Sequence, residues 1–320
     1  MVTSVTLRAH TNPPIVATSL NIIRAVADKE FWKLVERLYE QLPALNDFGA
    51  SGVHVIFPQM PVAPTNSTPG GFQALMTIQF LFANQPSVEA VRTALMPLET
   101  AFRNSSDNNT HSDPAEFQFS TTAFPTLSEF YTTTLTGVDR GGALTAMGSR
   151  LVSRTFIASA SGPRTVADTF SRLRLSPGEA VSGNIVAGGA VARNSDVSSA
   201  VNPAWRRTLS HVSIIRGWGA NATLAEQTQV QKELTEEMIP ALKKLRLSDE
   251  PEMGSYLNEA DAYEPDFQRS FWGLENYRRL YTIKKRWDPK GLFIVRRGVG
   301  SEDWDDDGLC RVRSCNGDRV

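Results

Sequence analysis

The chain has 320 residues, 41% hydrophobic and 21% charged, which is ordinary for a globular protein and excludes disorder as its main state. Its 33 basic and 34 acidic residues give a net charge of -1, so nothing in the composition asks for nucleic acid or an anionic membrane as a partner. No apolar run is long enough to span a bilayer, and residues 1–7 lack the basic and apolar regions of a signal peptide.

The first hundred residues alternate between strand and helix patterns. Strand patterns cover residues 1–9, 15–23, 52–60 and 74–82, and helix patterns cover residues 28–43 and 88–102. Pro43 is expected to end the first helix, and Pro97 to bend or shorten the second. This order predicts an α+β fold, in which helices cover one face of an antiparallel sheet.

The rest of the chain continues the same alternation. Strand patterns cover residues 151–157, 183–192, 211–217 and 291–295, and helix patterns cover residues 126–133, 165–173, 224–247 and 274–287. Thr126 and Glu129 have the spacing of a capping box. Pro240 is expected to kink the long helix, and Asp288 before Pro289 is expected to end the last one.

Cysteine and histidine are too sparse to predict a metal site. Cys310 and Cys315 both lie in the last eleven residues, where a disulfide can join them, and no cysteine–histidine cluster has zinc spacing. Asn-x-Ser/Thr sequons occur at Asn66, Asn104, Asn108 and Asn221. They are compatible with a secreted glycoprotein, although such sequons also arise by chance.

The C-terminal residues carry several motifs in order. Tyr256, Asn258 and Asp261 have the spacing Tyr-x-Asn-x-x-Asp, and residues 271–277 form an aromatic-Gly-x-x-Asn-aromatic step. Residues 284–293 then run from a helix into Trp-Asp-Pro and a phenylalanine. This succession resembles the C-terminal signature of berberine bridge enzymes, with Trp287 in place of the usual tyrosine. Residues 201–206 and 298–304 also resemble fungal isoamyl alcohol oxidases.

The resemblance implies an FAD-dependent oxidoreductase in two parts. An N-terminal domain would hold FAD, often through a histidine and a cysteine, and a substrate domain would cover the flavin ring. Residues 1–14 would be the last strand of the FAD-binding domain, 15–250 the substrate-binding domain, and 251–320 the C-terminal segment. The tethering residues would precede Met1. The implied partners are an alcohol-type small molecule and the missing or separate FAD-binding domain, and the implied location is extracellular.

Two residues are candidates for catalysis, Tyr256 and His211. Oxidation of an alcohol needs a base for the hydroxyl proton. Tyr256 serves as that base only if its pKa, ~10 in the unperturbed side chain, is lowered by nearby cations or hydrogen bonds. The alternative is a tyrosine packed at the domain boundary. His211 enters a predicted strand, where it is either a base within reach of substrate or a core histidine with satisfied hydrogen bonds.

Four residues are candidates for contact with the cofactor. Asn258 can bond the flavin or orient Tyr256, or else stabilise a turn. Asn276 is placed near FAD by the resemblance, and its alternative role is to open a helix. Gly188 and Gly189 lie in a predicted strand, where glycines mark either a bulge or the close approach of a ligand. Their expected strand context speaks against a dinucleotide-binding loop. Asp261 is expected to bond locally, and Lys284, Lys285 and Arg286 to form a solvated basic face.

Three functional hypotheses follow. The chain is part of an FAD-linked oxidase that acts on an alcohol or a secondary-metabolite hydroxyl, and is inactive alone. Alternatively, it binds a small ligand without turnover, or a separate chain completes it with a flavin domain in trans.

Overall fold

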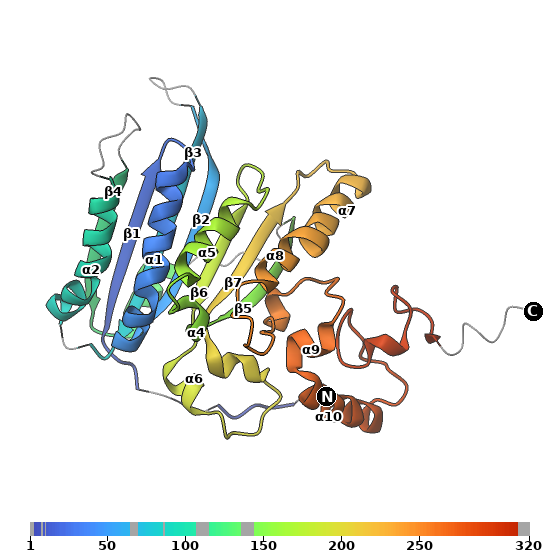
Figure 1. Cartoon of the computed structure of the whole chain (residues 1–320). Helices are drawn as coiled ribbons and strands as arrows, with labels where there is room; N and C mark the ends of the chain where they lie inside the picture. Colours follow the sequence, from blue (N-terminus) through green and yellow to red (C-terminus); the bar gives the residue numbers. More distant parts are fainter. Residues whose placement is uncertain are drawn as a thin grey trace, which may run out of the picture.

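The computed structural model describes residues 3–7, 9, 11–64, 70–85, 87–106, 115–135 and 144–312. Its centre is a seven-stranded antiparallel sheet in the order β4-β1-β3-β2-β6-β7-β5 (Figure 1). The strands are β1 (Ile15–Arg24), β2 (Ala50–Val62), β3 (Gly71–Ala83), β4 (Glu116–Phe124), β5 (Thr145–Ser153), β6 (Ala180–Ile185) and β7 (Thr208–Gly217). The predicted α+β class, with an antiparallel sheet and helices on one face, is confirmed.

Helices lie along one face of this sheet and at its lower end (Figure 1). They are α1 (Lys29–Phe48), α2 (Val88–Ser106), α3 (Leu127–Phe130), α4 (Arg154–Ile157), α5 (Gly162–Ser171), α6 (Gly189–Arg193), α7 (Leu224–Glu233), α8 (Ile239–Lys243), α9 (Phe267–Trp272) and α10 (Leu274–Trp287). Within the described residues, no helix is long and apolar enough to cross a membrane.

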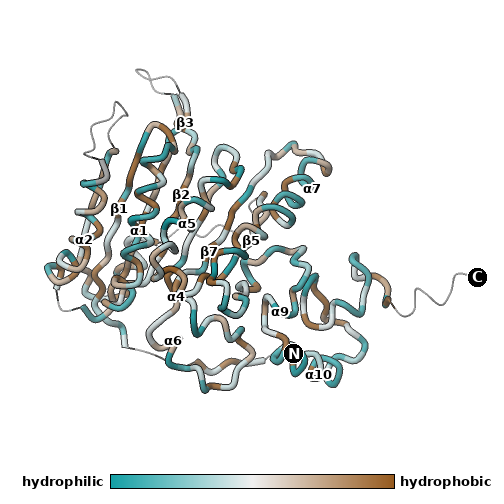
Figure 2. Tube along the Cα trace, in the orientation of Figure 1, coloured by the Kyte–Doolittle hydropathy of each residue, from teal (hydrophilic) through white to brown (hydrophobic). Residues whose placement is uncertain are grey.

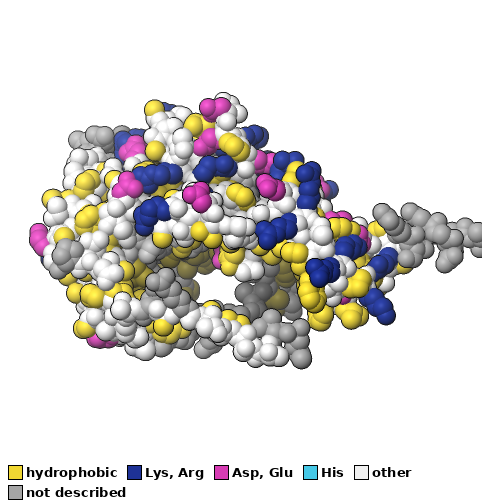
Figure 3. Space-filling model, turned by 90° about the horizontal axis from the view of Figure 1, so that it is seen from below, with side chains coloured by type: hydrophobic (Ala, Val, Ile, Leu, Met, Phe, Trp, Pro, Cys, Tyr) yellow, Lys and Arg dark blue, Asp and Glu magenta, His cyan; other side chains and the backbone are white. Residues whose placement is uncertain are grey.

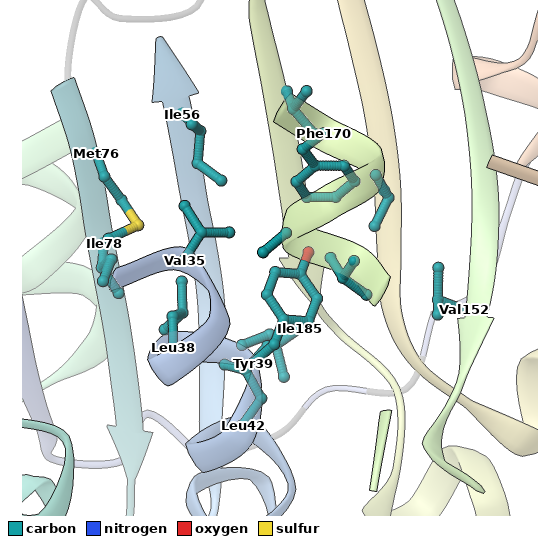
Figure 4. Close-up of a cluster of buried hydrophobic side chains, with 14 of the residues drawn as sticks. Val35, Leu38, Tyr39, Leu42, Ile56, Met76, Ile78, Val152, Phe170 and Ile185 are labelled. Atoms are coloured by element: carbon teal, nitrogen blue, oxygen red, sulfur yellow. The ribbon is translucent and has the colours of Figure 1, made fainter. Parts of the chain in front are cut away.

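The core lies between α1, α5 and the sheet. Figure 4 shows side chains of α1, among them Leu38 and Tyr39, facing Ile56 of β2, Met76 of β3 and Phe170 of α5. Each is fully or almost fully buried, and burying such a side chain contributes about 1.5–3 kcal/mol. A second, smaller cluster holds the C-terminal segment together through Phe267, Phe271, Trp272 and Tyr277. Figure 2 shows that the strands around the main core are apolar, whereas α7 and α10 are largely hydrophilic.

The prediction that Pro43 ends the first helix is wrong, because packing outweighs the lost hydrogen bond. α1 runs through Pro43 and ends at Gly49, which adopts φ 106° and donates its N–H to Asn46 and Leu45 carbonyls. Leu42 and Leu45 are buried on either side of Pro43 and hold the helix on the sheet. α2 likewise continues past Pro97.

Other helix predictions hold in part. Thr126 accepts from the Glu129 N–H at 3.1 Å and caps α3, which a π-helical turn then follows. The long helix is interrupted just before Pro240, by a π-helical turn at Leu234–Met238 between α7 and α8. Such one-turn insertions are a known cause of helix kinks. The final helix begins and ends as predicted.

Two strand predictions fail at least in part because side-chain hydrogen bonds intervene. The described residues 3–7 and 9 pair with no strand in the described part of the chain, and their assignment to a strand of the FAD-binding domain stays a prediction. The strand expected at residues 151–157 stops at Ser153, whose Oγ accepts from the Phe156 N–H at 3.0 Å and opens α4. No strand forms at residues 291–295, because the Asp288 carboxylate takes the Leu292 and Phe293 N–H groups at 2.8 and 3.0 Å.

The strand predicted at residues 183–192 is wrong in its second half. β6 ends at Ile185, and the glycine pair lies at the turn from that strand into α6. Gly188 has φ 85° and ψ -161°, a conformation open to glycine alone. The predicted strand context of Gly188 and Gly189 is therefore wrong, since the pair lies between a strand and a helix. Sequence patterns also missed β4, an edge strand. The predicted Cys310–Cys315 disulfide and the sequons at Asn66 and Asn108 involve residues outside those described.

Candidate functional site

The sheet face turned away from α1 carries rows of polar side chains. The strand register aligns Ser120, Ser19, Gln79, Val53, Asn184, His211 and Leu151 in one row, and Gln118, Asn21, Thr77, Val55, Ser182, Ser213 and Ser149 in the next. Their neighbours in sequence, such as Ile22 and Val212, are fully buried in the core on the other face. A polar sheet face of this kind offers hydrogen bonds to a hydroxylated ligand.

The C-terminal segment reaches this face by passing the free edge of β5. The Leu151 N–H donates to the Gly254 carbonyl at 2.8 Å, which places residue 254 alongside the edge strand. Beyond this edge, Glu259 contacts two side chains of the polar face: it accepts from Ser213 Oγ at 3.1 Å and lies 3.6 Å from His211 Nδ1. The segment thus brings Tyr256 and Asn258 to one end of the polar rows.

Three aromatic rings meet where the segment crosses β7. The ring centroids of His211 and Tyr256 are 5.8 Å apart at 85°, and Trp205 lies 5.8 Å from His211 and 5.9 Å from Tyr256. Trp205 is positioned by the 3-10 turn Pro203–Arg207, which the Asn202 side chain caps. Both candidates for catalysis are therefore in one cluster, although 45 residues separate them in sequence.

His211 is almost completely buried, at 2% exposure. Burial lowers its pKa, and the Glu259 carboxylate opposes that shift in part, so the net pKa lies below the ordinary value. The imidazole is accordingly neutral near pH 7 and able to accept a proton. Among the described residues, its Nε2 has no hydrogen-bond partner, which is unusual for a buried polar atom.

Tyr256 and Asn258 are exposed and bonded to each other. The Asn258 amide donates to the Tyr256 hydroxyl at 2.7 Å. Tyr256 keeps 37% of its surface exposed while its ring edge packs against His211 and Trp205. This geometry makes Asn258 an orienting partner of a partly exposed Tyr256.

The remaining candidates for cofactor contact lie apart from this cluster. Asn276, in the first turn of α10, donates to the Val201 carbonyl at 3.0 Å. Gly188 packs against the Asn46 side chain, because a Cβ added to Gly188 would lie 2.3 Å from Asn46 Oδ1. A Cβ added to Gly189 would meet no atom within 4 Å. Their proposed contact with FAD stays a prediction.

The charged residues singled out in the sequence bond both to near neighbours and to residues well separated in sequence. Asp261 is buried and accepts from the Tyr263 N–H and from Gln231 Nε2, both at 2.8 Å. Lys284 pairs with Asp288 at 2.5 Å, and Lys285 pairs with Asp303. Figure 3 shows Lys and Arg side chains gathered at the right of the molecule, over the region where Figure 1 places α10. The same view shows a hollow bordered in part by hydrophobic side chains.

Sequence reasoning missed Glu259, Ser213 and the polar rows. The rows had a local signal, because Ser19 and Asn21 alternate with buried Leu20 and Ile22 along β1. The contact between Glu259 and His211 had none, since it depends on the path of the segment past β5. The described residues contain no group of three or more side chains suited to hold a metal ion.

Comparison with known proteins defines the class. Residues 255–300 match the family model "Berberine and berberine like". The fold matches the VAO-type flavoprotein MtVAO713 of Myceliophthora thermophila, with a TM-score of 0.78 and 24% identity over 94% of this chain and 51% of that one. It also matches berberine bridge enzyme at a TM-score of 0.58 and 16% identity, over 89% of this chain and 55% of that one. The sheet and its helices therefore share the fold of the matching half of a VAO-type flavoprotein.

Sequence relatives are fungal. The chain is 37% identical to an FAD-linked oxidoreductase of Arthroderma benhamiae over 98% of its own length, and 35% identical to FAD-linked oxidoreductase malF of Malbranchea aurantiaca over 97%. It spans 50% and 48% of those two proteins. The chain thus matches fungal FAD-linked oxidoreductases of the berberine-bridge and VAO type over about half of their length, and it aligns with their C-terminal part. Those relatives are named as FAD-linked, and these residues correspond to about half of their length.

Proposed function

We propose that these residues form the substrate side of an enzyme that oxidises an alcohol or a secondary-metabolite hydroxyl with FAD. The observation that carries the proposal is the cluster of Tyr256, His211 and Asn258 at one end of a polar sheet face. Its rows of serine, asparagine and glutamine suit a hydroxylated substrate.

In this proposal, the chain supplies position and proton transfer. Asn258 orients the oxygen of Tyr256, which as the phenolate takes the substrate proton, and the neutral His211 imidazole beside the tyrosine ring is the second candidate base. FAD, when bound, supplies the acceptor for the hydride. The residues fit such a ring: the Tyr256–Asn258 pair is exposed, and Gly189 leaves open space beside its backbone. Asn258, Asn276, Gly188 and Gly189 are the proposed contacts to the cofactor.

Exposed apolar side chains on the C-terminal segment support a missing partner half. Leu292 and Phe293 are each 78% exposed, and Trp287 is 77% exposed. Water-exposed groups of this size typically mark an interface. The FAD-binding half found in relatives is the proposed occupant of this surface.

The test begins with the absorbance spectrum of the purified chain after incubation with FAD and desalting. We expect a colourless protein, and a retained flavin band once the region that precedes these residues in relatives is restored. Alcohols should then bleach that band under anaerobic conditions. Tyr256→Phe should slow bleaching about 100-fold or more, as expected for a lost general base. Tyr131→Phe, at an exposed position on the π-helical turn after α3, is the matched control.

The outcomes separate the three hypotheses. Flavin retained without reduction by any alcohol, or equal rates for Tyr256→Phe and the restored wild type, would contradict the oxidase. Ligand binding without flavin would favour a binding protein, and activity only after mixing with a separate flavin domain would favour completion in trans.

We also propose that the protein is secreted. Asn104 and Asn221, the sequons among the described residues, are both exposed and so accessible to glycosylation. A processed, glycosylated product in the medium of the native host would support this location, and an exclusively intracellular one would contradict it.

A further inference from the structure

A groove lies on the helix side of the molecule, away from the polar sheet face. It has a volume of about 390 Å³, and its walls are Trp218 after β7, residues of α7 and of the turn that follows it, and Tyr263. Trp218 packs partly against the main core, so its ring has a fixed place. Gln231 is held by its bonds to Asp261 at 2.8 Å and to Thr235 at 3.3 Å. Packing and hydrogen bonds therefore hold an aromatic ring and an amide group in place in the wall of the groove.

The loop that borders this groove carries the sequon Asn221-Ala222-Thr223. Asn221 is exposed in a turn, and the groove residues Trp218 and Leu224 lie three positions before and after it. The Ala222 carbonyl accepts from Nε2 of Gln227, another groove residue, at 3.0 Å. The Thr223 side chain caps α7 in a capping box with Glu226. The loop is thus held against the wall of the groove.

The chemistry of the groove suits sugar rings. Trp218 and Tyr263 offer aromatic surface, while Gln227, Thr228 and Gln231 offer amide and hydroxyl groups. A pyranose has apolar C–H faces that pack on aromatic rings and hydroxyls that bond to amides. Leu224 is 79% exposed at the start of α7, so a covering group would also shield it.

We propose that Asn221 carries an N-linked glycan whose first sugars lie in this groove. The Asn221 amide nitrogen forms a bond to the anomeric carbon of an oligosaccharide carried on a lipid diphosphate. The bond from that carbon to the phosphate oxygen breaks, the lipid diphosphate leaves, and the amide loses one proton. The proposal rests on entry into the secretory pathway but not on oxidase activity. Figure 1 shows the β7–α7 loop at the upper end of the sheet, far from α9 and α10, so within the C-terminal segment the glycan contacts Tyr263 and leaves those two helices free.

The test uses the 320-residue chain secreted from a yeast host behind a signal sequence. Peptide mass spectrometry after deglycosylation in heavy-oxygen water reports occupancy at each sequon. The rate of enzymatic glycan release from the native protein reports shielding. We expect Asn221 to be occupied and its glycan to be released about fivefold more slowly than that of Asn104, since groove contacts must first open.

Two variants separate the groove from the sequon. Trp218→Ala and Leu224→Ala should keep Asn221 occupied and raise its release rate toward that of Asn104. Leu224 is mostly exposed, so its variant stays folded if Trp218→Ala does not. Asn221→Gln is the unglycosylated control. An unmodified Asn221, or a release rate equal to that of Asn104 and unchanged in Leu224→Ala, would overturn the proposal.

Discussion

Arg150, on the edge strand β5, is the largest fully buried side chain among the described residues. It donates to Glu264 at 2.6 Å and to Ser255 at 2.8 Å, and Lys243 reaches the other Glu264 oxygen at 2.8 Å. Burial alone raises the pKa of Glu264, but Arg150 and Lys243 hold it below its ordinary value. This ion pair fastens the C-terminal segment to the sheet.

Removal of Arg150 should therefore be costly. Arg150→Met leaves Glu264 with one cation, and we expect the free energy of unfolding to fall by about 3 kcal/mol. Arg154→Met is the matched control, because its pair with Asp47 is exposed at 38% and 68% and should contribute at most about 1 kcal/mol. Urea unfolding of both variants checks this, and equal losses would contradict it.

His54 gives the fold a pH dependence of its own. It lies beneath α1, with Nε2 3.0 Å from the Tyr39 hydroxyl, and burial lowers its pKa to about 4. The histidine of the unfolded chain, with a pKa of ~6.5, binds a proton more readily than the buried one. The stabilisation of the fold by neutral His54 is therefore complete above pH ~6.5 and is lost as pH falls toward 4. The total is about 3 kcal/mol.

His54→Gln should remove that dependence while keeping an acceptor for Tyr39. Unfolding free energies of wild type and variant, measured from pH 7.5 to pH 4.5, should converge by about 2–3 kcal/mol as the pH falls. Parallel curves would show that His54 titrates alike in both states.

At the scale of elements, the β6–α6 junction depends on Gly188. A Cβ there would meet Asn46 Oδ1 at 2.3 Å, and φ 85° is unfavourable for any other residue. Gly188→Ala should lower the free energy of unfolding by about 2 kcal/mol or more, whereas Gly189→Ala, with φ 44° and open space, should cost about 1 kcal/mol. Thermal unfolding of both variants tests this, and a larger loss for Gly189→Ala would contradict the steric argument.

The elements also show what the sequence can predict. β1 and β3 were predictable because their side chains alternate strictly between a buried and an open face. The end of β5 was not, because apolar residues recur at 156 and 157 beyond Ser153, whereas the Ser153 hydroxyl accepts from the Phe156 N–H and opens a helix there. Residues 291–295 were mispredicted as a strand because Asp288, a residue outside the run, takes its amides.

The same limit applies to the site at the scale of the whole molecule. The C-terminal motifs located Tyr256 and Asn258 because those residues are close in sequence. The meeting of Tyr256 with His211 depends on the path of the chain around β5, which no local pattern encodes. The group that covers the polar face in the relatives is proposed to lie in their other half, so this sequence contains no signal for it.

The exposed apolar surface of the C-terminal segment yields the last prediction. Asp288 fixes the backbone of Leu292 and Phe293 while both side chains stay 78% exposed. The double variant Leu292→Ser/Phe293→Ser should bind less of an environment-sensitive apolar dye than wild type, with the free energy of unfolding unchanged within about 0.5 kcal/mol.

Met96→Ser, 57% exposed on the distant α2, is the matched control and should change dye binding far less. If this surface receives the FAD-binding half, restoring that half should abolish the difference between wild type and the double variant in dye binding. The same variant should then weaken retention of flavin, because the interface that closes over the cofactor loses two apolar contacts. Equal dye binding by the double variant and Met96→Ser would show that this surface is not the dominant apolar patch.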